Sequence, residues 1–204
     1  MNKITITLVF KLLLIIILSS CSDAEKLRPL DDNAIILAFG DSLTYGTGTS
    51  RNKSYPAELQ TIIEHRVINA GVPGETSVQG LLRLPGLISQ HHPNLIIIWH
   101  GANDILRKMD IKQTQDNIQQ MINISSENNV QVILIGVPEF GIFLSDSPIY
   151  HALADKNHLH IENDVLGDIL IKNTHKSDYV HPNALGYRTI AERIATLLKE
   201  SGAI

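Results

Sequence analysis

The segment that decides the fold is Leu95-Ile96-Ile97-Ile98-Trp99, which lies between Pro93 and Gly101. All five residues are apolar, which is typical of a strand buried on both of its faces. Other short apolar runs, also expected to be strands, span residues 35–39, 67–70, 130–135 and, more weakly, 158–161.

Amphipathic segments alternate with these runs. Apolar residues recur at helical spacing in 55–66, 76–90 and 114–123, a weaker helix is expected before residue 158, and Ile190, Ile194, Leu197 and Leu198 share one face of a final helix. Pro85 is expected to kink the second of these helices. Strands that alternate with helices predict a parallel sheet of about five strands with helices on both faces, a doubly wound three-layer α/β/α sandwich.

Length and charge limit the possible functions. A chain of 204 residues is long enough for one well-buried core and too short for two ordinary domains. The net charge of -4 and the absence of a clustered basic surface argue against a nucleic-acid partner. The sequence does not indicate an oligomeric state.

The N-terminus has the pattern of a secretory signal. Lys3 and Lys11 precede an unbroken aliphatic run at 12–18, which ends in Leu18-Ser19-Ser20-Cys21. This ending resembles the bacterial lipobox, whose cysteine is lipidated after cleavage, and Cys21 is the only cysteine in the chain. A transmembrane helix over 4–18 is disfavoured because it would be short and would hold Lys11.

Three parts of the chain are therefore expected. Residues 1–20 form a lipoprotein signal peptide, 21–33 form a lipidated N-terminus and polar tether, and 34–204 form one folded domain. The expected location is the bacterial cell envelope, where the lipid on Cys21 would hold the protein to a membrane, facing the periplasm or the exterior.

Ser42 is the candidate nucleophile, because it follows the first expected strand by three residues. Gly-Asp-Ser after a strand is also a common turn. No Gly-Lys-Ser/Thr follows to make a phosphate-binding loop. Thr44 replaces the last glycine of a Gly-x-Ser-x-Gly elbow, which disfavours the α/β-hydrolase fold.

His181 is the candidate general base, with Asp178 to orient its imidazole. The Asp-x-x-His spacing is not specific, since Asp155 and His158 repeat it. The later pair precedes the final helix in a loop that can reach over the sheet, whereas the earlier pair is expected in a helix that leads into an edge strand. The remaining histidines have no partners at metal-ligand spacing, so no metal site is predicted; they are His65, His91, His92, His100, His151, His160 and His175.

Two further residues could stabilise an oxyanion. Asn103 follows the strand at 95–99 and carries an amide donor, although an ordinary Asn-Asp turn would look the same. Gly74 could offer an unobstructed backbone N–H, and Gly71 is a competing candidate. Asp41 and Asp104 are expected to hold their own loops by hydrogen bonds.

These segments resemble the motif blocks of the SGNH hydrolases, the GDSL esterase and lipase superfamily. The blocks are Gly40-Asp41-Ser42-Leu43, Gly74, Gly101-Ala102-Asn103-Asp104 and Asp178-Tyr179-Val180-His181, in the expected order from about Ile35 to the C-terminus. The segments 69–77, 83–85 and 100–107 are similar to those of the bacterial periplasmic thioesterase, lysophospholipase and arylesterase group.

The resemblance implies a flavodoxin-like sandwich, no cofactor, and a triad of Ser42, His181 and Asp178. The implied oxyanion hole is the N–H groups of Ser42 and Gly74 with the amide of Asn103. Ala102 departs from the family pattern, where a second glycine is common. The segment 139–150 does not match the family. Its Ile142, Phe143 and Leu144 are expected to line an acyl site, with packing against the body of the protein as the alternative.

The expected function is hydrolysis of carboxylic esters or thioesters through an acyl-enzyme on Ser42. Esterase, arylesterase, lysophospholipase and acyl-CoA thioesterase activities all fit. A carbohydrate or cell-wall O-acetyl esterase would use the same residues. A surface binding module without catalysis is disfavoured because no catalytic position is substituted.

Overall fold

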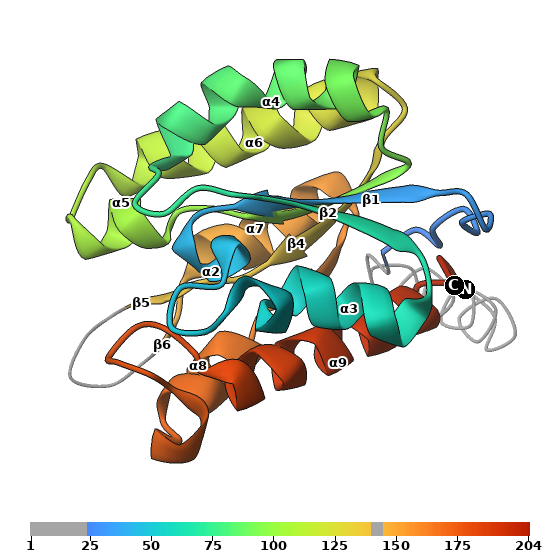
Figure 1. The fold of residues 1–204 in the computed structure, drawn as a ribbon. Helices are drawn as coiled ribbons and strands as arrows, with labels where there is room; N and C mark the ends of the chain where they lie inside the picture. Colours follow the sequence, from blue (N-terminus) through green and yellow to red (C-terminus); the bar gives the residue numbers. More distant parts are fainter. Residues whose placement is uncertain (1–23, 140–144) are drawn as a thin grey trace, which may run out of the picture.

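Five parallel strands form the central sheet of the protein. The computed structural model describes residues 24–139 and 145–204 (Figure 1). The strand order is β2-β1-β3-β4-β7, and every neighbouring pair is parallel. The strands are β1 (Ile35–Gly40), β2 (Arg66–Gly71), β3 (Leu95–Trp99), β4 (Gln131–Ile135) and β7 (His160–Glu162).

Helices cover both faces of this sheet. Figure 1 shows α4 and α6 above it and α3, α8 and α9 below it, and the contacts of α4 with α6 and of α3 with α9 agree with this arrangement. This confirms the predicted three-layer sandwich. The main helices are α3 (Tyr55–Ile63), α4 (Ser77–His91), α6 (Ile111–Glu127), α7 (Pro148–Asn157) and α9 (Ala184–Glu200).

Several short elements were not predicted, because segments of two to six residues carry too little periodicity to be identified as helices or strands. They are α2 (Ser42–Tyr45), α5 (Ala102–Leu106), α8 (Val165–Leu170), two 3₁₀ turns (Arg51–Lys53 and Asn173–His175) and the hairpin of β5 (Pro138–Glu139) with β6 (Ser145–Asp146).

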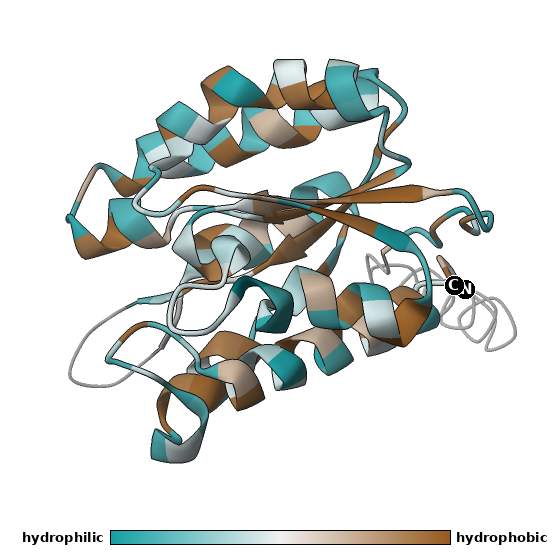
Figure 2. Cartoon of the chain, in the orientation of Figure 1, coloured by the Kyte–Doolittle hydropathy of each residue, from teal (hydrophilic) through white to brown (hydrophobic). Residues whose placement is uncertain are grey.

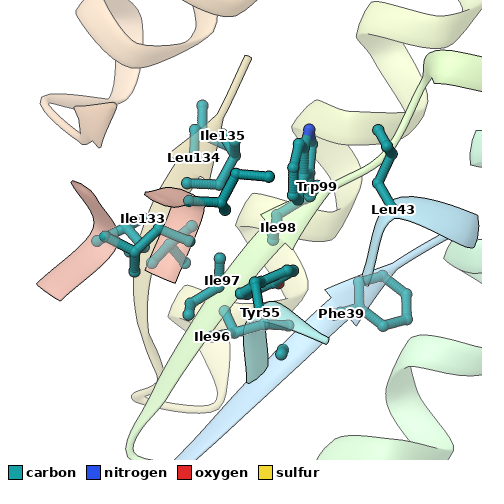
Figure 3. Packing of buried hydrophobic residues seen from close by; sticks show 14 of the residues in the cluster. Phe39, Leu43, Tyr55, Ile96, Ile97, Ile98, Trp99, Ile133, Leu134 and Ile135 are labelled. Carbon is teal, nitrogen blue, oxygen red and sulfur yellow. The ribbon is translucent and has the colours of Figure 1, made fainter. Parts of the chain in front are cut away.

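The core lies around β3. All five of its side chains are at most 1% exposed, and Trp99 packs against the ring of Tyr55 at 5.4 Å between centroids (Figure 3). Figure 2 shows the same organisation: hydrophobic strands at the centre, and helices whose hydrophilic residues face outward. Each fully buried aliphatic side chain stabilises the fold by about 2 kcal/mol. The apolar runs of the sequence therefore account for the sandwich.

Side-chain caps set the helix ends more exactly than periodicity can. The α6 helix begins at Ile111, three residues before the predicted start, because the Asp110 side chain accepts hydrogen bonds from the N–H groups of Lys112 and Gln113. A capping box of Thr76 and Gln79 starts α4, which continues through Pro85 to His91.

The segment before β1 is bonded to the body from Glu25 onward. The backbone N–H groups of Leu27 and Leu30 donate to the carbonyls of Ser201 and Ala203 at 2.9 and 2.8 Å, and the Glu25 N–H donates to His158. These bonds hold the later part of the predicted tether, residues 21–33, at the edge of the sheet where the strands begin, opposite their carboxyl ends. The predicted signal peptide and Cys21 lie outside the described residues. Among the described helices, none has the length and apolar character needed to cross a bilayer.

The strand order places a topological switch point between β1 and β3. From β1 the chain moves outward to β2, then crosses back to β3 and continues in the other direction through β4 to β7. In such sheets, ligands bind beyond the carboxyl ends of the strands at this point. Ser42 follows β1 and Asn103 follows β3, so the two residues flank the switch point.

Candidate active site

Ser42 is the first residue of α2, directly after the tight turn that leaves β1. The side chain of Asp41 caps this helix by accepting from the Leu43 N–H at 3.0 Å. A side chain at Gly40 would clash, since a Cβ there would lie 2.2 Å from Thr44 Oγ1 and 2.4 Å from the Trp99 carbonyl. The strand therefore runs closely past β3, and the Ser42 hydroxyl is presented at the rim of the sheet, where it is partly exposed.

His181 and Asp178 complete a continuous chain of hydrogen bonds with Ser42. His181 Nε2 lies 3.0 Å from Ser42 Oγ, and Nδ1 lies 2.8 Å from Asp178 Oδ2. Burial opposes ionisation of Asp178, but hydrogen bonds from the Val180 N–H and from His181 outweigh it and lower the pKa of this carboxyl. The ionised carboxylate can therefore hold the proton of the imidazole at Nδ1, which leaves Nε2 to accept a proton from the serine.

The loop that carries His181 is fastened on both sides. Lys176 and Pro182 form an isolated antiparallel bridge, and the Ser177 N–H donates to the His181 carbonyl at 2.9 Å. Beyond the loop, the Tyr187 hydroxyl donates to the Thr47 carbonyl at 2.8 Å, which joins α9 to the turn after α2. These contacts bring together two residues that are 139 positions apart in the chain.

Asn103 and Gly74 lie on adjacent loops. The Asn103 amide donates to Asp41 Oδ2 at 3.2 Å and to the Glu75 carbonyl at 3.0 Å, so it is held between the loop of Ser42 and the loop of Gly74. Gly74 has a φ of 77°, a conformation that glycine adopts readily. Arg107 donates to its carbonyl at 2.9 Å.

The backbone bonds of this loop distinguish Gly74 from its competitor Gly71. The Gly71 N–H donates to the Asn69 side chain, and the N–H groups of Val72 and Glu75 donate to carbonyls. Within the described part of the chain, the Gly74 N–H has no acceptor. It remains available to a ligand, as does the N–H of Ser42, which begins a helix and so lacks an intrahelical partner.

The two aspartates of the motifs do more than hold their own loops. Asp41 reaches across to Asn103, and burial raises its pKa to about 7. Asp104 accepts from both the N–H and the hydroxyl of Ser77, and from the hydroxyl of Thr114. It therefore ties α5 to the starts of α4 and α6, which sequence reasoning missed.

Sequence reasoning also missed an ion pair beneath these loops. Arg83 on α4 donates from Nε and Nη2 to the carboxylate of Glu75, both at 2.6 Å. Its signals in the sequence are a charged residue between Leu82 and Leu84 in an amphipathic helix, and the similarity of the segments 69–77 and 83–85 to the family group.

The second Asp-x-x-His copy lies elsewhere. Asp155 is on α7, and His158 ends that helix with a φ of 52° before the edge strand β7. The sheet is parallel, so the start of β7 is at the opposite edge from Ser42. Among the other histidines, His100 is fully buried beside Phe39. No cluster of metal-ligating side chains occurs in residues 24–139 and 145–204.

An open hollow of about 460 Å³ adjoins the loop of His181, within the usual size range of small-molecule sites. Asn173, Lys176, Ser177, Asp178 and Tyr179 line it. The predicted acyl-site residues Ile142, Phe143 and Leu144 lie outside the described residues. At the end of the same segment, 139–150, Tyr150 is buried, and its hydroxyl donates to the His100 carbonyl at 2.7 Å, so this side chain packs into the core.

Comparison with known proteins identifies relatives along most of the chain. Residues 38–189 match the model of the GDSL-like lipase/acylhydrolase family. An arylesterase of Vibrio mimicus is 33% identical over 171 residues, which cover 78% of this chain and 86% of the relative. Thioesterase 1/protease 1/lysophospholipase L1 of Escherichia coli K12 is 30% identical over 172 residues, with 80% and 83% covered.

Solved structures agree with this relationship. The psychrotrophic esterase EstA from Pseudoalteromonas sp. is similar with a TM-score of 0.74 and 27% identity, over 82% of this chain and 98% of EstA. A crystal structure of TesA is similar with a TM-score of 0.75 and 27% identity, over 82% and 99%. The chain belongs to the GDSL-like lipase/acylhydrolase family.

Proposed function

We propose that this chain hydrolyses carboxylic esters or thioesters through an acyl-enzyme on Ser42. The observation that carries the proposal is the unbroken series of hydrogen bonds from Asp178 through His181 to the Ser42 hydroxyl, with a distance of 3.0 Å at the serine. Family membership and the esterase, arylesterase and thioesterase names of the relatives support the same reaction class.

The first half of the reaction forms the acyl-enzyme. Ser42 Oγ attacks the substrate carbonyl while His181 Nε2 takes the serine proton. The developing oxyanion accepts hydrogen bonds from the N–H groups of Ser42 and Gly74 and from the amide of Asn103. That amide has two protons and two partners before substrate binds, and the longer bond, to Asp41, is the one we expect to be exchanged for the oxyanion. Each such donor contributes about 3 kcal/mol to the transition state.

Loss of the leaving group completes the acyl-enzyme, and hydrolysis then releases the acid. The protonated His181 gives its proton to the leaving alcohol or thiol as the bond to the acyl carbon breaks. A water molecule then attacks the acyl-enzyme, with His181 again accepting the proton, and the acid leaves as Ser42 recovers its hydroxyl.

The test is an ester panel on the purified protein. p-Nitrophenyl esters from acetyl to dodecanoyl, an acyl-CoA and a lysophospholipid would be compared with acetylated xylan, which tests the O-acetyl esterase alternative. We expect turnover of at least one acyl ester, abolished in Ser42→Ala with the circular dichroism spectrum unchanged. Equal turnover by the Ser42→Ala variant would refute the proposal.

We also propose that Cys21 carries a lipid that holds the enzyme in the cell envelope. The support is the Leu18-Ser19-Ser20-Cys21 ending of the apolar segment, in a chain with no other cysteine. Metabolic labelling with an alkyne-bearing fatty acid should mark the wild-type protein and leave Cys21→Ser unmarked. An unmarked wild-type protein would contradict lipidation.

A further inference from the structure

One arginine contacts the loops that carry the predicted oxyanion donors. Besides its two bonds to Glu75, Arg83 Nη2 donates to the carbonyl of Ala70 at 2.7 Å and to that of Gly40 at 3.1 Å. These carbonyls are at the ends of β2 and β1, the strands that lead to Gly74 and Ser42. The guanidinium also lies over the ring of Phe39, at 4.5 Å from its centroid.

Glu75 connects Arg83 to the loop that carries Gly74. Its backbone directly follows Gly74, and its carbonyl accepts the hydrogen bond from the Asn103 amide at 3.0 Å. The position of Glu75 thus affects both the direction of the Gly74 N–H and the position of the Asn103 amide. If Glu75 moved, both donors would shift relative to Ser42.

The Glu75 carboxylate depends on Arg83. Its side chain is 6% exposed, and Arg83 is its one hydrogen-bonding partner among the described residues. His100 Nε2 lies 3.4 Å away, but the His100 ring nitrogens make no hydrogen bond in the described structure. Burial and the nearby Arg83 charge lower the pKa of His100 to about 3, so this ring is neutral beside the ion pair and Arg83 supplies the positive charge. A buried carboxylate without a partner is strongly destabilising, so the loop would rearrange.

We propose that Arg83 is a positioning residue which, through Glu75, fixes the Gly74 N–H and the Asn103 amide for oxyanion binding. This inference rests on the proposed esterase function. It assigns to Arg83 a role in the transition state, whereas an ion pair that only stabilised the fold would leave turnover by the folded enzyme unchanged.

A double-mutant cycle on the full chain tests the proposal. Arg83→Met should lower kcat by about 100-fold, comparable to the loss of one oxyanion donor, with a much smaller change in KM. In an Asn103→Ala background the same substitution should cost at least about 5-fold less than it does in the wild-type background, because only the Gly74 N–H then remains to be displaced. Equal losses in the two backgrounds, or an unchanged kcat in Arg83→Met, would overturn the proposal.

Arg193→Met is the matched control. Arg193 also forms a two-bond ion pair with a largely buried carboxylate, Glu162, at 3.1 Å for both bonds. Among the described residues, its hydrogen bonds and ion pairs do not reach the loops of Ser42, Gly74 and Asn103. The kcat of the Arg193→Met variant should stay within about twofold of wild type, whatever the drop in Tm. A loss of kcat like that of Arg83→Met would show that any broken ion pair has this effect and would contradict the inference.

Arg83→Lys provides the variant for the case in which Arg83→Met does not fold. Lysine keeps the charge but cannot form the two-bond contact with Glu75, so an intermediate loss of kcat is expected and wild-type kcat would contradict the proposal. The proposed function is judged separately, by whether wild-type protein hydrolyses esters and Ser42→Ala does not.

Discussion

The chain contains Asp-x-x-His twice, and the two copies differ in almost everything except their spacing. At Asp178 and His181 the motif lies in a loop, and its imidazole touches both the carboxylate and the Ser42 hydroxyl. At Asp155 and His158 it spans the end of α7, where His158 terminates the helix at the far edge of the sheet. The Asp-x-x-His spacing can therefore support catalysis only where the element that carries it brings the imidazole to a reactive group.

The supports of the two copies explain this difference. The Ser177–His181 backbone bond and the Tyr187–Thr47 bond hold the later loop against the turn after α2. The earlier copy is held by helix geometry instead, since the His158 N–H donates to Ala154 and Asp155 in the last turn of α7. The later copy leaves His181 Nε2 directed at the Ser42 hydroxyl, whereas the earlier copy ends α7 at His158.

The largest expected effect separates the two histidines. His181→Ala removes the base that activates Ser42 and should lower kcat by about 10⁴-fold or more. His158→Ala should leave kcat within about twofold of wild type. Steady-state hydrolysis of a p-nitrophenyl ester measures both. A large loss in His158→Ala together with a small one in His181→Ala would reverse the assignment.

The two aspartates should differ in the same direction by a smaller amount. Asp178→Asn keeps the size of the side chain but cannot stabilise the imidazolium, so we expect kcat to fall by about 10³- to 10⁴-fold. Asp155→Asn, the same substitution in the other copy, should have little effect on kcat. Equal activity of the two variants would show that Asp178 does not orient His181.

The smallest expected effect concerns stability and a third histidine, His100. Its pKa is lowered to about 3, whereas an unfolded imidazole takes up a proton near pH 6.5. Between these values the unfolded state binds more protons, so this group makes the free energy of unfolding fall as the pH falls. Glu75 and Arg83 are the charged groups around the ring. His100→Leu should therefore become more stable relative to wild type as the pH falls from about 7 to about 5.

Urea unfolding of both proteins at the two pH values measures this difference. A stability difference that does not change with pH would contradict the assignment of His100 as a buried neutral ring. In contrast to His181, this histidine affects stability through its burial and has no contact with Ser42.

The apolar runs were sufficient to predict the sheet. Because Ser42, Gly74 and Asn103 each follow an expected strand, the sequence also predicted that they meet at one rim of that sheet. Strands such as 95–99 are identifiable because burial on both faces requires apolar residues at every position. The bonds of the segment at 25–30 to Ser201 and Ala203 were not predictable, since they join backbone groups whose proximity only the completed fold creates. The Arg83–Glu75 pair was missed because its two side chains are eight residues apart, one in a loop and one on α4, a spacing that predicts no contact.

The central claim is that His181 activates Ser42 for attack, and the rate of serine phosphonylation measures this step most directly. A fluorophosphonate probe should label the wild-type protein at Ser42, as mapped by mass spectrometry. Labelling should be as fast in His158→Ala and slower by orders of magnitude in His181→Ala, and Ser42→Ala should remain unlabelled. An adduct on another residue, or equal labelling rates in the two histidine variants, would contradict the account.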